Sequence, residues 1–395
     1  MAINKEQNKL NVPHLRFPEF QGEWEKCKLG DIATLTKGSG ISKDQRSATG
    51  TPCILYGELY TTYKSEVINY VVSKTDISDK NLVRSCANDI IIPSSGETAI
   101  DISTARCVLS PDVLLGGDLN IIRLKDGDGR FFSYQLNGVR KHDIAKIAQG
   151  VSVVHLYGES IKGLTVSFPS NKEQQKISTL LSLIDERIAT QSKLIEDLKK
   201  LKSAIIEKLY SEIQGKEYSY RQLFEIINER NNRLEFSNVL SASQERGMVS
   251  REDLNLDIKF ERSNINTYKI VRNGDYVIHL RSFQGGFAFS DIVGVCSPAY
   301  TIMRPKDLLE YGYLSYYFTS RQFIKSLVIV TYGIRDGRSI NVDEWFDMKI
   351  VIPTKEQQRH IVRTIKVFEN KIENEEIYAS CLLKQKQHLL RQMFI

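Results

Sequence analysis

The sequence lacks the marks of several common protein classes. It has no apolar run near the roughly 18 residues of a membrane-spanning helix, and its N-terminus has no apolar core of signal-peptide type. The six cysteines are scattered without a CxxC pair, and no histidine stands at ligand spacing. This pattern argues against both a disulfide framework and a zinc site. We therefore expect a cytoplasmic protein with reduced thiols and no metal.

Motifs for catalysis are also missing. The Gly-rich stretch KGSGISKD lacks the Gly-Lys pair that ends a phosphate-binding loop, and no [DNS]PP[YF] methyltransferase motif occurs. His155 and His279 lie in or next to strand-like runs without a recognisable nucleophile. We interpret both as structural histidines rather than catalytic ones.

What is present is an ordinary globular composition with a mild positive charge. The 395 residues are 41% hydrophobic and 26% charged, enough for two domains with separate cores. The net charge is +6 and the sequence pI is near 8.8. A bias of this size is compatible with a polyanionic partner but does not by itself indicate one.

One phrase occurs twice. FPSNKEQQKI in the first half returns in the second half as VIPTKEQQRHI, each time after a β-rich run that ends in proline. A hydroxyl residue, Ser170 or Thr354, stands three positions before Glu173 or Gln357. This spacing is typical of a capping box, so both copies are predicted to begin helices.

Both predicted helices continue in one heptad register. Apolar residues follow at alternating spacings of four and three, interrupted at Gln191 and Lys202 in the first helix and at Glu375 and Lys386 in the second. Such a long seam predicts coiled-coil pairing, most simply of one helix with the other. The predicted core is Ile177, Leu181, Ile184, Ile188, Ile195, Leu198, Ile205, Leu209, Ile361, Ile365, Phe368, Ile372, Leu382, Leu389 and Met393.

The segments before the helices are also related. W-x4-LGDI from Trp24 is similar to Y-x4-LFEI from Tyr218, and NDIII from Asn88 is similar to GDYVI from Gly274. QGVSVVHLYGESIKGLTVSFP likewise corresponds to YGIRDGRSINVDEWFDMKIVIP. The chain is therefore predicted to be a diverged tandem duplication, with SEIQGKEYS as the hinge.

These motifs, in this order and at this spacing, resemble the DNA specificity subunits of type I restriction-modification systems. The resemblance covers nearly the whole chain and rests on W-x4-LGDI, QG-x-S, P-x2-KEQQ-x-I-x6-ID-x2-I and P-x-KEQQ-x2-I. The second copy departs from it, with FENKI in place of LIDERI and YGIRDG in place of QGVSVV. These departures leave the architecture intact but prevent any transfer of base contacts.

The resemblance implies an α+β fold with two β-rich α/β target-recognition domains, joined by two long helices that form an antiparallel coiled coil. The expected division is an N-terminal arm at 1–22, a first target-recognition domain at 23–169, a first spacer helix at 170–212, a second domain at 213–353 and a second spacer helix at 354–395.

The resemblance also implies the function. Each domain would recognise one half of a bipartite site in double-stranded DNA, and the helices would dock two methyltransferase (modification) subunits, with two restriction/translocase subunits completing the complex. This chain would be non-catalytic and hold no cofactor. S-adenosylmethionine, ATP and Mg would belong to the partner subunits.

The residues expected to contact DNA are polar or basic side chains on loops, because such groups bond to base edges and phosphates. In the first domain they are Lys37, Ser39, Ser94, Ser95, Gln149 and Ser152. In the second they are Ser243, Gln244, Arg246, Arg281, Gln284, Arg335 and Arg338, of which Arg335 and Arg338 are ranked highest.

Two other classes stay open. A fused recognition and cleavage or methylation enzyme would need catalytic motifs that the chain lacks. A coiled-coil adaptor that never binds DNA would explain the helices but not two diverged domains with Arg-bearing loops.

Overall fold

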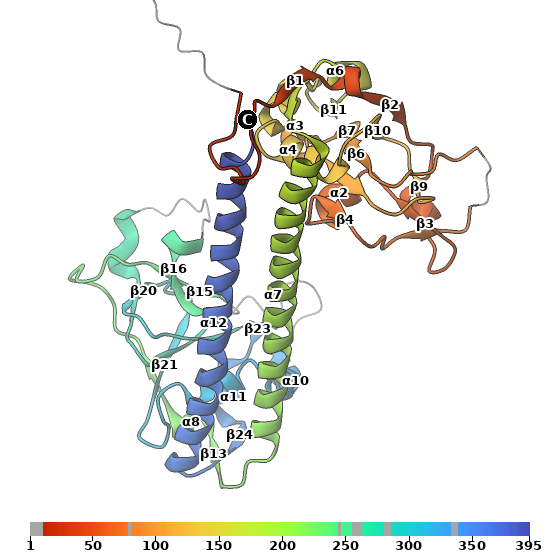
Figure 1. Ribbon diagram of the computed structural model, residues 1–395. Helices are drawn as coiled ribbons and strands as arrows, with labels where there is room; N and C mark the ends of the chain where they lie inside the picture. Colours follow the sequence, from red (N-terminus) through yellow and green to blue (C-terminus); the bar gives the residue numbers. More distant parts are fainter. Residues whose placement is uncertain (1–10, 78–80, 244–245, 255–261, 280–285, 333–338) are drawn as a thin grey trace, which may run out of the picture. The chain divides into compact units, whose positions relative to one another are not determined.

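A computed structural model of the chain describes residues 11–77, 81–243, 246–254, 262–279, 286–332 and 339–395 (Figure 1). The chain forms two compact units. The first unit combines Met1–Ser192 with Ile377–Ile395, and the second unit is Lys193–Glu376. Both units contain part of each long helix. None of the helices in the described ranges is long and apolar enough to cross a membrane.

The first unit is built on a five-stranded sheet in the order β2-β10-β6-β8-β4. All neighbours are antiparallel except β4 and β8. The strands are β2 (Ala33–Lys37), β10 (Leu119–Leu124), β6 (Asp89–Pro93), β8 (Arg106–Val108) and β4 (Val67–Ile68). Every residue of β6 is buried, as its continuous apolar run requires of a strand covered on both faces.

Smaller elements surround this sheet. The entry strand β1 (Glu25–Lys28) pairs with the exit strand β12 (Thr165–Phe168), and α4 (Gly129–Asn137) packs on β6 and β8. The others are α1 (Leu29–Ile32), β3 (Thr51–Ile54), α2 (Glu58–Thr61), β5 (Lys74–Thr75), β7 (Ser95–Gly96), α3 (Ala99–Ile102), β9 (Leu114–Leu115), α5 (Lys141–Ile147), β11 (Val154–His155), α6 (Gly158–Lys162) and the 3₁₀ turn η1 (Lys43–Gln45).

The second unit repeats the central frame. β14 (Phe224–Ile227), β21 (Thr301–Pro305) and β18 (Tyr276–Ile278) pair antiparallel, as β2, β10 and β6 do. β13 (Lys216–Ser219) pairs with β24 (Lys349–Ile352), as β1 does with β12. The others are α8 (Tyr220–Leu223), β15 (Leu240–Ser243), β16 (Gly247–Ser250), η2 (Arg251–Leu254), η3 (Arg262–Thr267), β17 (Lys269–Val271), β19 (Phe287–Phe289), β20 (Gly294–Cys296), α9 (Tyr313–Tyr317), α10 (Arg321–Ser326), η4 (Leu327–Val330), β22 (Thr331–Tyr332), β23 (Ser339–Ile340) and α11 (Val342–Asp347).

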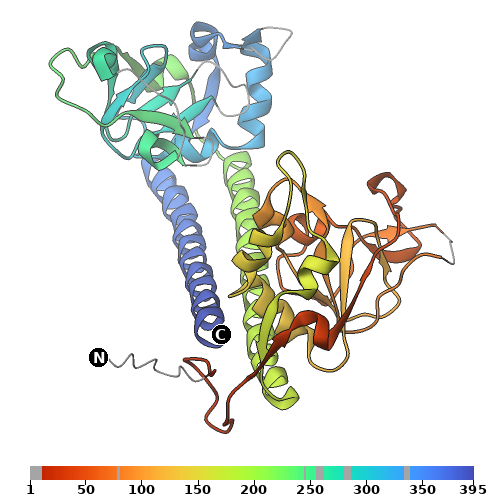
Figure 2. The same ribbon diagram turned by 90° about the horizontal axis from the view of Figure 1, so that it is seen from above.

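Two long helices complete both units. α7 spans Asn171–Ser211 and α12 spans Lys355–Gln392, and within each unit their segments lie side by side (Figures 1 and 2). In the first unit Arg187 Nε donates to Tyr378, and in the second Lys199 Nζ lies 2.7 Å from Glu376 Oε1. The pairing is antiparallel. The expected α+β fold with a pair of long packed helices is confirmed.

Each predicted core position of the helices lies buried or half-buried. The buried ones include Ile177 and Leu181 of α7 and Ile361, Ile365 and Ile372 of α12. The seam is therefore directed inward along both helices, while Leu183, Leu194 and Leu201 lie exposed outside it.

The interruptions of the seam carry ion pairs. In the first unit Lys386, only 8% exposed, bonds to Glu66 and lies 2.5 Å from Asp185 Oδ1, while Asp185 Oδ2 accepts from the Tyr134 hydroxyl at 2.8 Å. In the second unit Lys202 lies 3.3 Å from Glu369, which accepts from Tyr316.

These two clusters occupy matching positions of the repeat. Lys202 of α7 corresponds in the repeat to Lys386 of α12, and Glu369 of α12 corresponds to Asp185 of α7. Burial beside these carboxylates also raises the pKa of Tyr134 and of Tyr316. The duplication thus extends from the heptad pattern to individual polar contacts.

A second matched contact explains the repeated phrase. Gln174, 2% exposed, donates to the Pro169 carbonyl and accepts from the Asp128 amide. Gln358, 1% exposed, donates to the Pro353 carbonyl and accepts from Glu310. This glutamine holds the turn from the last strand into the long helix in both units, which accounts for its presence four residues after each cap.

The helix caps themselves differ. Thr354 and Gln357 form the predicted reciprocal cap on α12. At the start of α7, both carboxylate oxygens of Glu173 instead accept from the guanidinium of Arg16. The N-terminal arm therefore ties down the first turn of α7, a contact that the local capping pattern did not reveal.

A third matched contact lies in the two frames. Asp89 at the start of β6 accepts two bonds from Arg123 of β10, and Asp275 just before β18 accepts two from Arg304 of β21. Both carboxylates are 1% exposed, and the hydrogen bonds raise the pKa of each arginine. Each Asp also accepts a bond from the backbone amide three residues earlier, so its carboxylate connects the turn before the strand to the neighbouring strand.

Candidate nucleic-acid interface

A tight hairpin lies between α5 and α6 of the first unit, closed by Gln149 and His155. The amide of Gln149 donates to the His155 carbonyl at 2.9 Å, and the amide of His155 returns a bond to Gln149 at 2.7 Å. Gly150 has a φ of +124°, and a Cβ there would lie 2.1 Å from the Val153 carbonyl oxygen. Only glycine fits this turn without strain.

The hairpin is anchored to the central sheet. In β11, Val154 and His155 pair with Gly96 and Ser95 of β7, which follows β6 along the chain. Val154 is buried, but Val151 at the tip is 96% exposed and Val153 is 53% exposed. The framework thus fixes the base of the hairpin and leaves its tip in solvent.

Other side chains extend this exposed region. The His155 ring stacks on Tyr157, with ring centroids 6.3 Å apart and planes at 29°. Tyr157 and Lys37 line one hollow of about 280 Å³, together with Asn120, which pairs with Lys37 across β10 and β2. Lys37 itself is exposed at the end of β2.

We call this set the hairpin surface. Its members are Lys37, Ser95, Gln149, Val151, Ser152, Val153, His155 and Tyr157. The structure brings together Lys37, Ser95, Gln149 and Ser152 from the sequence prediction. Cation, amide, hydroxyl and aromatic groups on one exposed surface suit contacts with phosphates and base edges.

Two other residues that were predicted to contact DNA form hydrogen bonds within the first unit. The Ser39 hydroxyl accepts from the Val83 amide at 2.8 Å. Ser94 is 7% exposed, and its backbone bonds to Asp118 and Leu156. Burial removes Ser94 from a surface contact, so that part of the prediction is corrected.

In the second unit, the structure places two of the predicted residues. Ser243 ends β15 and is half-buried, and its hydroxyl accepts from the amide of the exposed Arg246 at 3.3 Å. This bond links the last residue of β15 to the residue just before β16. The remaining predicted residues lie outside the described residues, namely Gln244, Arg281, Gln284, Arg335 and Arg338.

Sequence reasoning missed four members of the hairpin surface, namely Val151, Val153, His155 and Tyr157. His155 was interpreted as structural, but its side chain is exposed. Val151 and Tyr157 gave no signal, because an apolar residue in a short β-rich run is expected to be buried. The glycine after Gln149 was the available clue, since it marks a turn whose tip cannot belong to the core.

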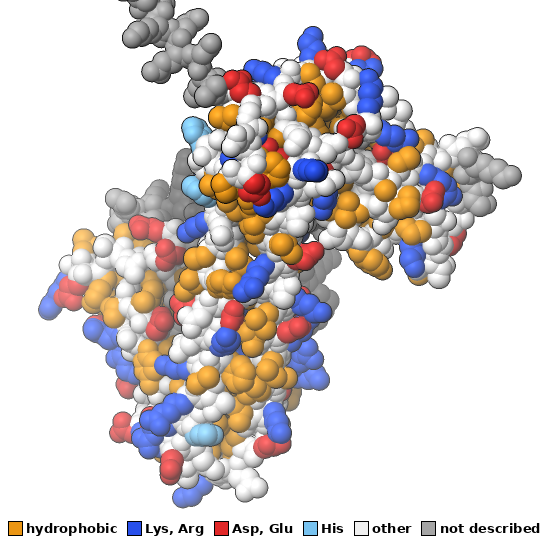
Figure 3. Space-filling model, viewed as in Figure 1, with side chains coloured by type: hydrophobic (Ala, Val, Ile, Leu, Met, Phe, Trp, Pro, Cys, Tyr) orange, Lys and Arg blue, Asp and Glu red, His pale blue; other side chains and the backbone are white. Residues whose placement is uncertain are grey.

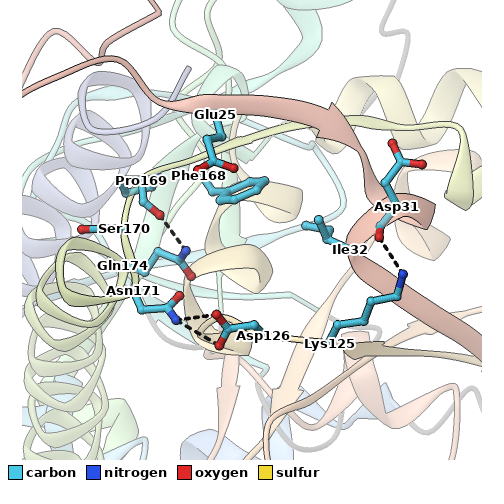
Figure 4. A pocket seen from close by; sticks show the side chains of 10 residues that line it. All are labelled: Glu25, Asp31, Ile32, Lys125, Asp126, Phe168, Pro169, Ser170, Asn171 and Gln174. Atoms are coloured by element: carbon cyan, nitrogen blue, oxygen red, sulfur yellow. Dashed lines mark hydrogen bonds between the residues drawn. The ribbon is translucent and has the colours of Figure 1, made fainter.

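The first unit also has a hollow of about 330 Å³ at the start of α7 (Figure 4). Its polar groups satisfy one another: Asn171 donates to both oxygens of Asp126, and Lys125 donates to the Asp31 carbonyl. With Glu25 and Asp31 also lining it, the hollow is a poor site for a phosphate. Within the described ranges, no group of three or more His, Cys, Asp and Glu gathers as for a metal ion.

Charge is distributed rather than gathered on the visible face. In Figure 3, Lys and Arg side chains are interspersed with Asp and Glu over each unit. This fits the modest net charge of +6. Among the described residues on this face, no continuous basic patch is visible.

Comparison with known proteins agrees with these observations. The family described as "Type I restriction modification DNA specificity domain" matches residues 21–200. The type I restriction enzyme MjaVIII specificity subunit of Methanocaldococcus jannaschii is 22% identical over 94% of this chain and 92% of its own length. A further protein of that organism is 23% identical over the same shares of the two chains.

Solved structures show the same fold. The S subunit of a type I restriction-modification system from M. genitalium matches with a TM-score of 0.58 at 16% identity, covering 97% of this chain and 99% of the other. A chain from a structural study of the assembly of a type I R-M system matches with a TM-score of 0.60 at 14% identity, covering 94% and 97%.

The duplicated frames and the two long helices define a two-unit protein with the fold of the matched type I S subunit. The match to the specificity domain and the relatives of similar length identify the class of protein that the chain resembles. Residues 21–200 match the type I restriction modification DNA specificity domain, and nearly the whole chain is similar to specificity subunits of type I restriction-modification systems.

Proposed function

We propose that each unit recognises one half of a bipartite site in duplex DNA, and that the first unit does so with the hairpin surface. The observation that carries this proposal is the matched set of contacts in the two units: the strand frame, the Asp–Arg pair and the Gln at the helix entry all occur twice. Two copies of one framework with different surface segments suit recognition of two different short sequences.

Within the complex, we propose that this chain is non-catalytic and cytoplasmic. The helices would dock two methyltransferase subunits, and two restriction/translocase subunits would join them. S-adenosylmethionine, ATP and Mg would bind to those partners. Support comes from the match to the specificity domain and from the missing phosphate-loop and methyltransferase motifs.

The test is to express this chain with its cognate methyltransferase subunit in methylation-free cells and to map modified adenines across the genome. We expect a split motif, with two short specific blocks around a gap of arbitrary bases. A complex that assembles and binds S-adenosylmethionine without methylating any motif would contradict the proposal and favour a coiled-coil adaptor. Methylation or cleavage by the purified chain alone would favour a fused enzyme.

A further inference from the structure

Val151 is the most exposed large hydrophobic residue of the described chain, at 96%. Folding does not explain this position, because the hairpin is held by the two backbone bonds between Gln149 and His155 and by the burial of Val154. A polar residue at the tip would satisfy the same backbone. The methyl groups of Val151 therefore have no role in the fold and are available for contact with a ligand.

The tip is short and firmly held. Gly150 allows the chain to turn within the closed backbone pair, and β11 continues into the ladder with β7. A β-branched valine has few rotamers to lose on binding. Its methyl groups are therefore presented in a nearly fixed position, beside the exposed hydroxyl of Ser152.

The chemistry of DNA restricts what such a tip can contact. Contacts to phosphates and sugars carry no sequence information directly, and the edges of bases in the major groove offer mainly donors and acceptors. The one apolar group on a base edge there is the C5-methyl of thymine. Ser152, Gln149 and His155 beside the tip can bond to neighbouring base edges, whereas Val151 can form no hydrogen bond with its side chain.

We propose that Val151 contacts the C5-methyl group of a thymine in the major groove of the half-site that the first unit recognises. This inference rests on the proposed function, and it makes Val151 a specificity-determining residue that favours thymine over cytosine at one position. It also requires an A·T pair in that half-site.

The test removes the thymine methyl group from the DNA and, in a second series, the Val151 methyl groups from the protein. The chain, assembled with its methyltransferase subunit, is titrated with duplexes of the mapped site in which each thymine of either strand is replaced in turn by deoxyuridine. At one position we expect affinity to fall about fourfold, the equivalent of one buried methyl group. The same series is repeated with Val151→Ala, for which thymine and uracil at that position should bind equally.

Two further variants serve as controls. Val72→Ala, at another exposed valine of the first unit, should keep the full uracil penalty. Val151→Thr retains the shape of valine and one of its methyl groups, so it should keep part of the uracil penalty. If no uracil substitution weakens binding, if the penalty is unchanged in Val151→Ala, or if the half-site has no A·T pair, the inference is wrong.

Failure of this inference differs from failure of the proposed function. A split methylation motif with no uracil penalty would leave bipartite recognition standing and overturn only the thymine contact. Loss of methyltransferase binding in Val151→Ala, with unchanged DNA affinity of the complex that still forms, would show that the tip contacts the partner protein instead.

Discussion

Lys37 carries the full positive charge of the hairpin surface. Its ammonium group is exposed at the end of β2 and can reach a phosphate without loss of any contact in the fold. We predict that Lys37→Ala weakens binding to all DNA sequences alike. Because one phosphate contact is lost, the slope of log K against log salt should become shallower by about 0.9.

Lys64→Ala is the control for this variant, since Lys64 is exposed just before β4, at the opposite edge of the sheet from β2. Its salt slope should equal that of the wild type. The measurement is fluorescence anisotropy of the assembled complex at several salt concentrations. A changed sequence preference with an unchanged slope in Lys37→Ala would instead indicate a base contact.

At the scale of single residues, the sequence predicted candidate DNA contacts but could not tell which of them lie free on the surface. Ser39 and Ser152 both occur in glycine-bearing polar stretches and look alike in one dimension. The difference arises from Val83, far along the chain, whose amide bonds to Ser39. Whether a loop hydroxyl is available to a ligand depends on such distant partners, which a local pattern does not contain.

At the scale of the elements, the matched ion pairs of α7 and α12 differ in burial, and their energies should differ with it. Lys386, Glu66 and Asp185 are all nearly buried, so Lys386→Met would leave two carboxylates without their cation at a cost of about 3–5 kcal/mol. Lys202 and Glu369 are partly exposed, so Lys202→Met should cost about 1 kcal/mol or less.

The measurement is denaturant unfolding of the three proteins, with Lys384→Met, an exposed lysine of the same helix, as the control. If Lys386→Met and Lys202→Met proved equally destabilising, burial would not govern the two clusters. Adding Asp185→Leu and Glu66→Gln to Lys386→Met should recover part of the lost stability, because no buried carboxylate then lacks a partner.

The heptad pattern predicted which faces of the long helices would be buried, since a period of 3.5 residues is a local property. It also marked the interruptions at Lys202 and Lys386. Their partners could not be predicted, because Glu66 and Tyr134 come from the first unit's β-rich part. Periodicity identifies a face but not what covers it.

At the scale of the whole molecule, the two units should respond differently to alkali. Burial raises the pKa of several tyrosines in the second unit, namely Tyr210, Tyr220, Tyr276, Tyr313 and Tyr316. In the first unit burial also raises the pKa of Tyr60, of Tyr134 and of Tyr63, the last to about 12. Buried phenols are thus concentrated in the second unit among the described residues.

The sign of the effect follows from proton binding. A tyrosine with a raised pKa keeps its proton in the folded state when the unfolded chain has already lost it, so its contribution to stability is complete below about pH 10 and is lost as pH rises further. We predict that the second unit unfolds first above that pH. Hydrogen exchange of peptides from each unit would check this, and earlier loss of protection in the first unit would contradict it.

The duplication was the large-scale feature that the sequence could predict, because caps, prolines and heptads repeat in order. The matched Gln174 and Gln358 show why KEQQ recurs with a shift of one residue: the position after the cap is kept, while the residues around it vary. The hairpin surface could not be predicted as a whole, because its members come from β2, from β7 and from the segment around β11, and these segments meet only in the folded unit.

The closed backbone pair at the base of the hairpin has a practical consequence for engineering. Gln149 and His155 fix both ends through main-chain bonds, which do not depend on the intervening side chains, and Gly150 and Val154 set the turn and the anchor. The side chains at positions 151–153 can thus be randomised in a library without changing the backbone bonds that close the hairpin. Selection from such a library would search for new half-site preferences while the scaffold stays constant.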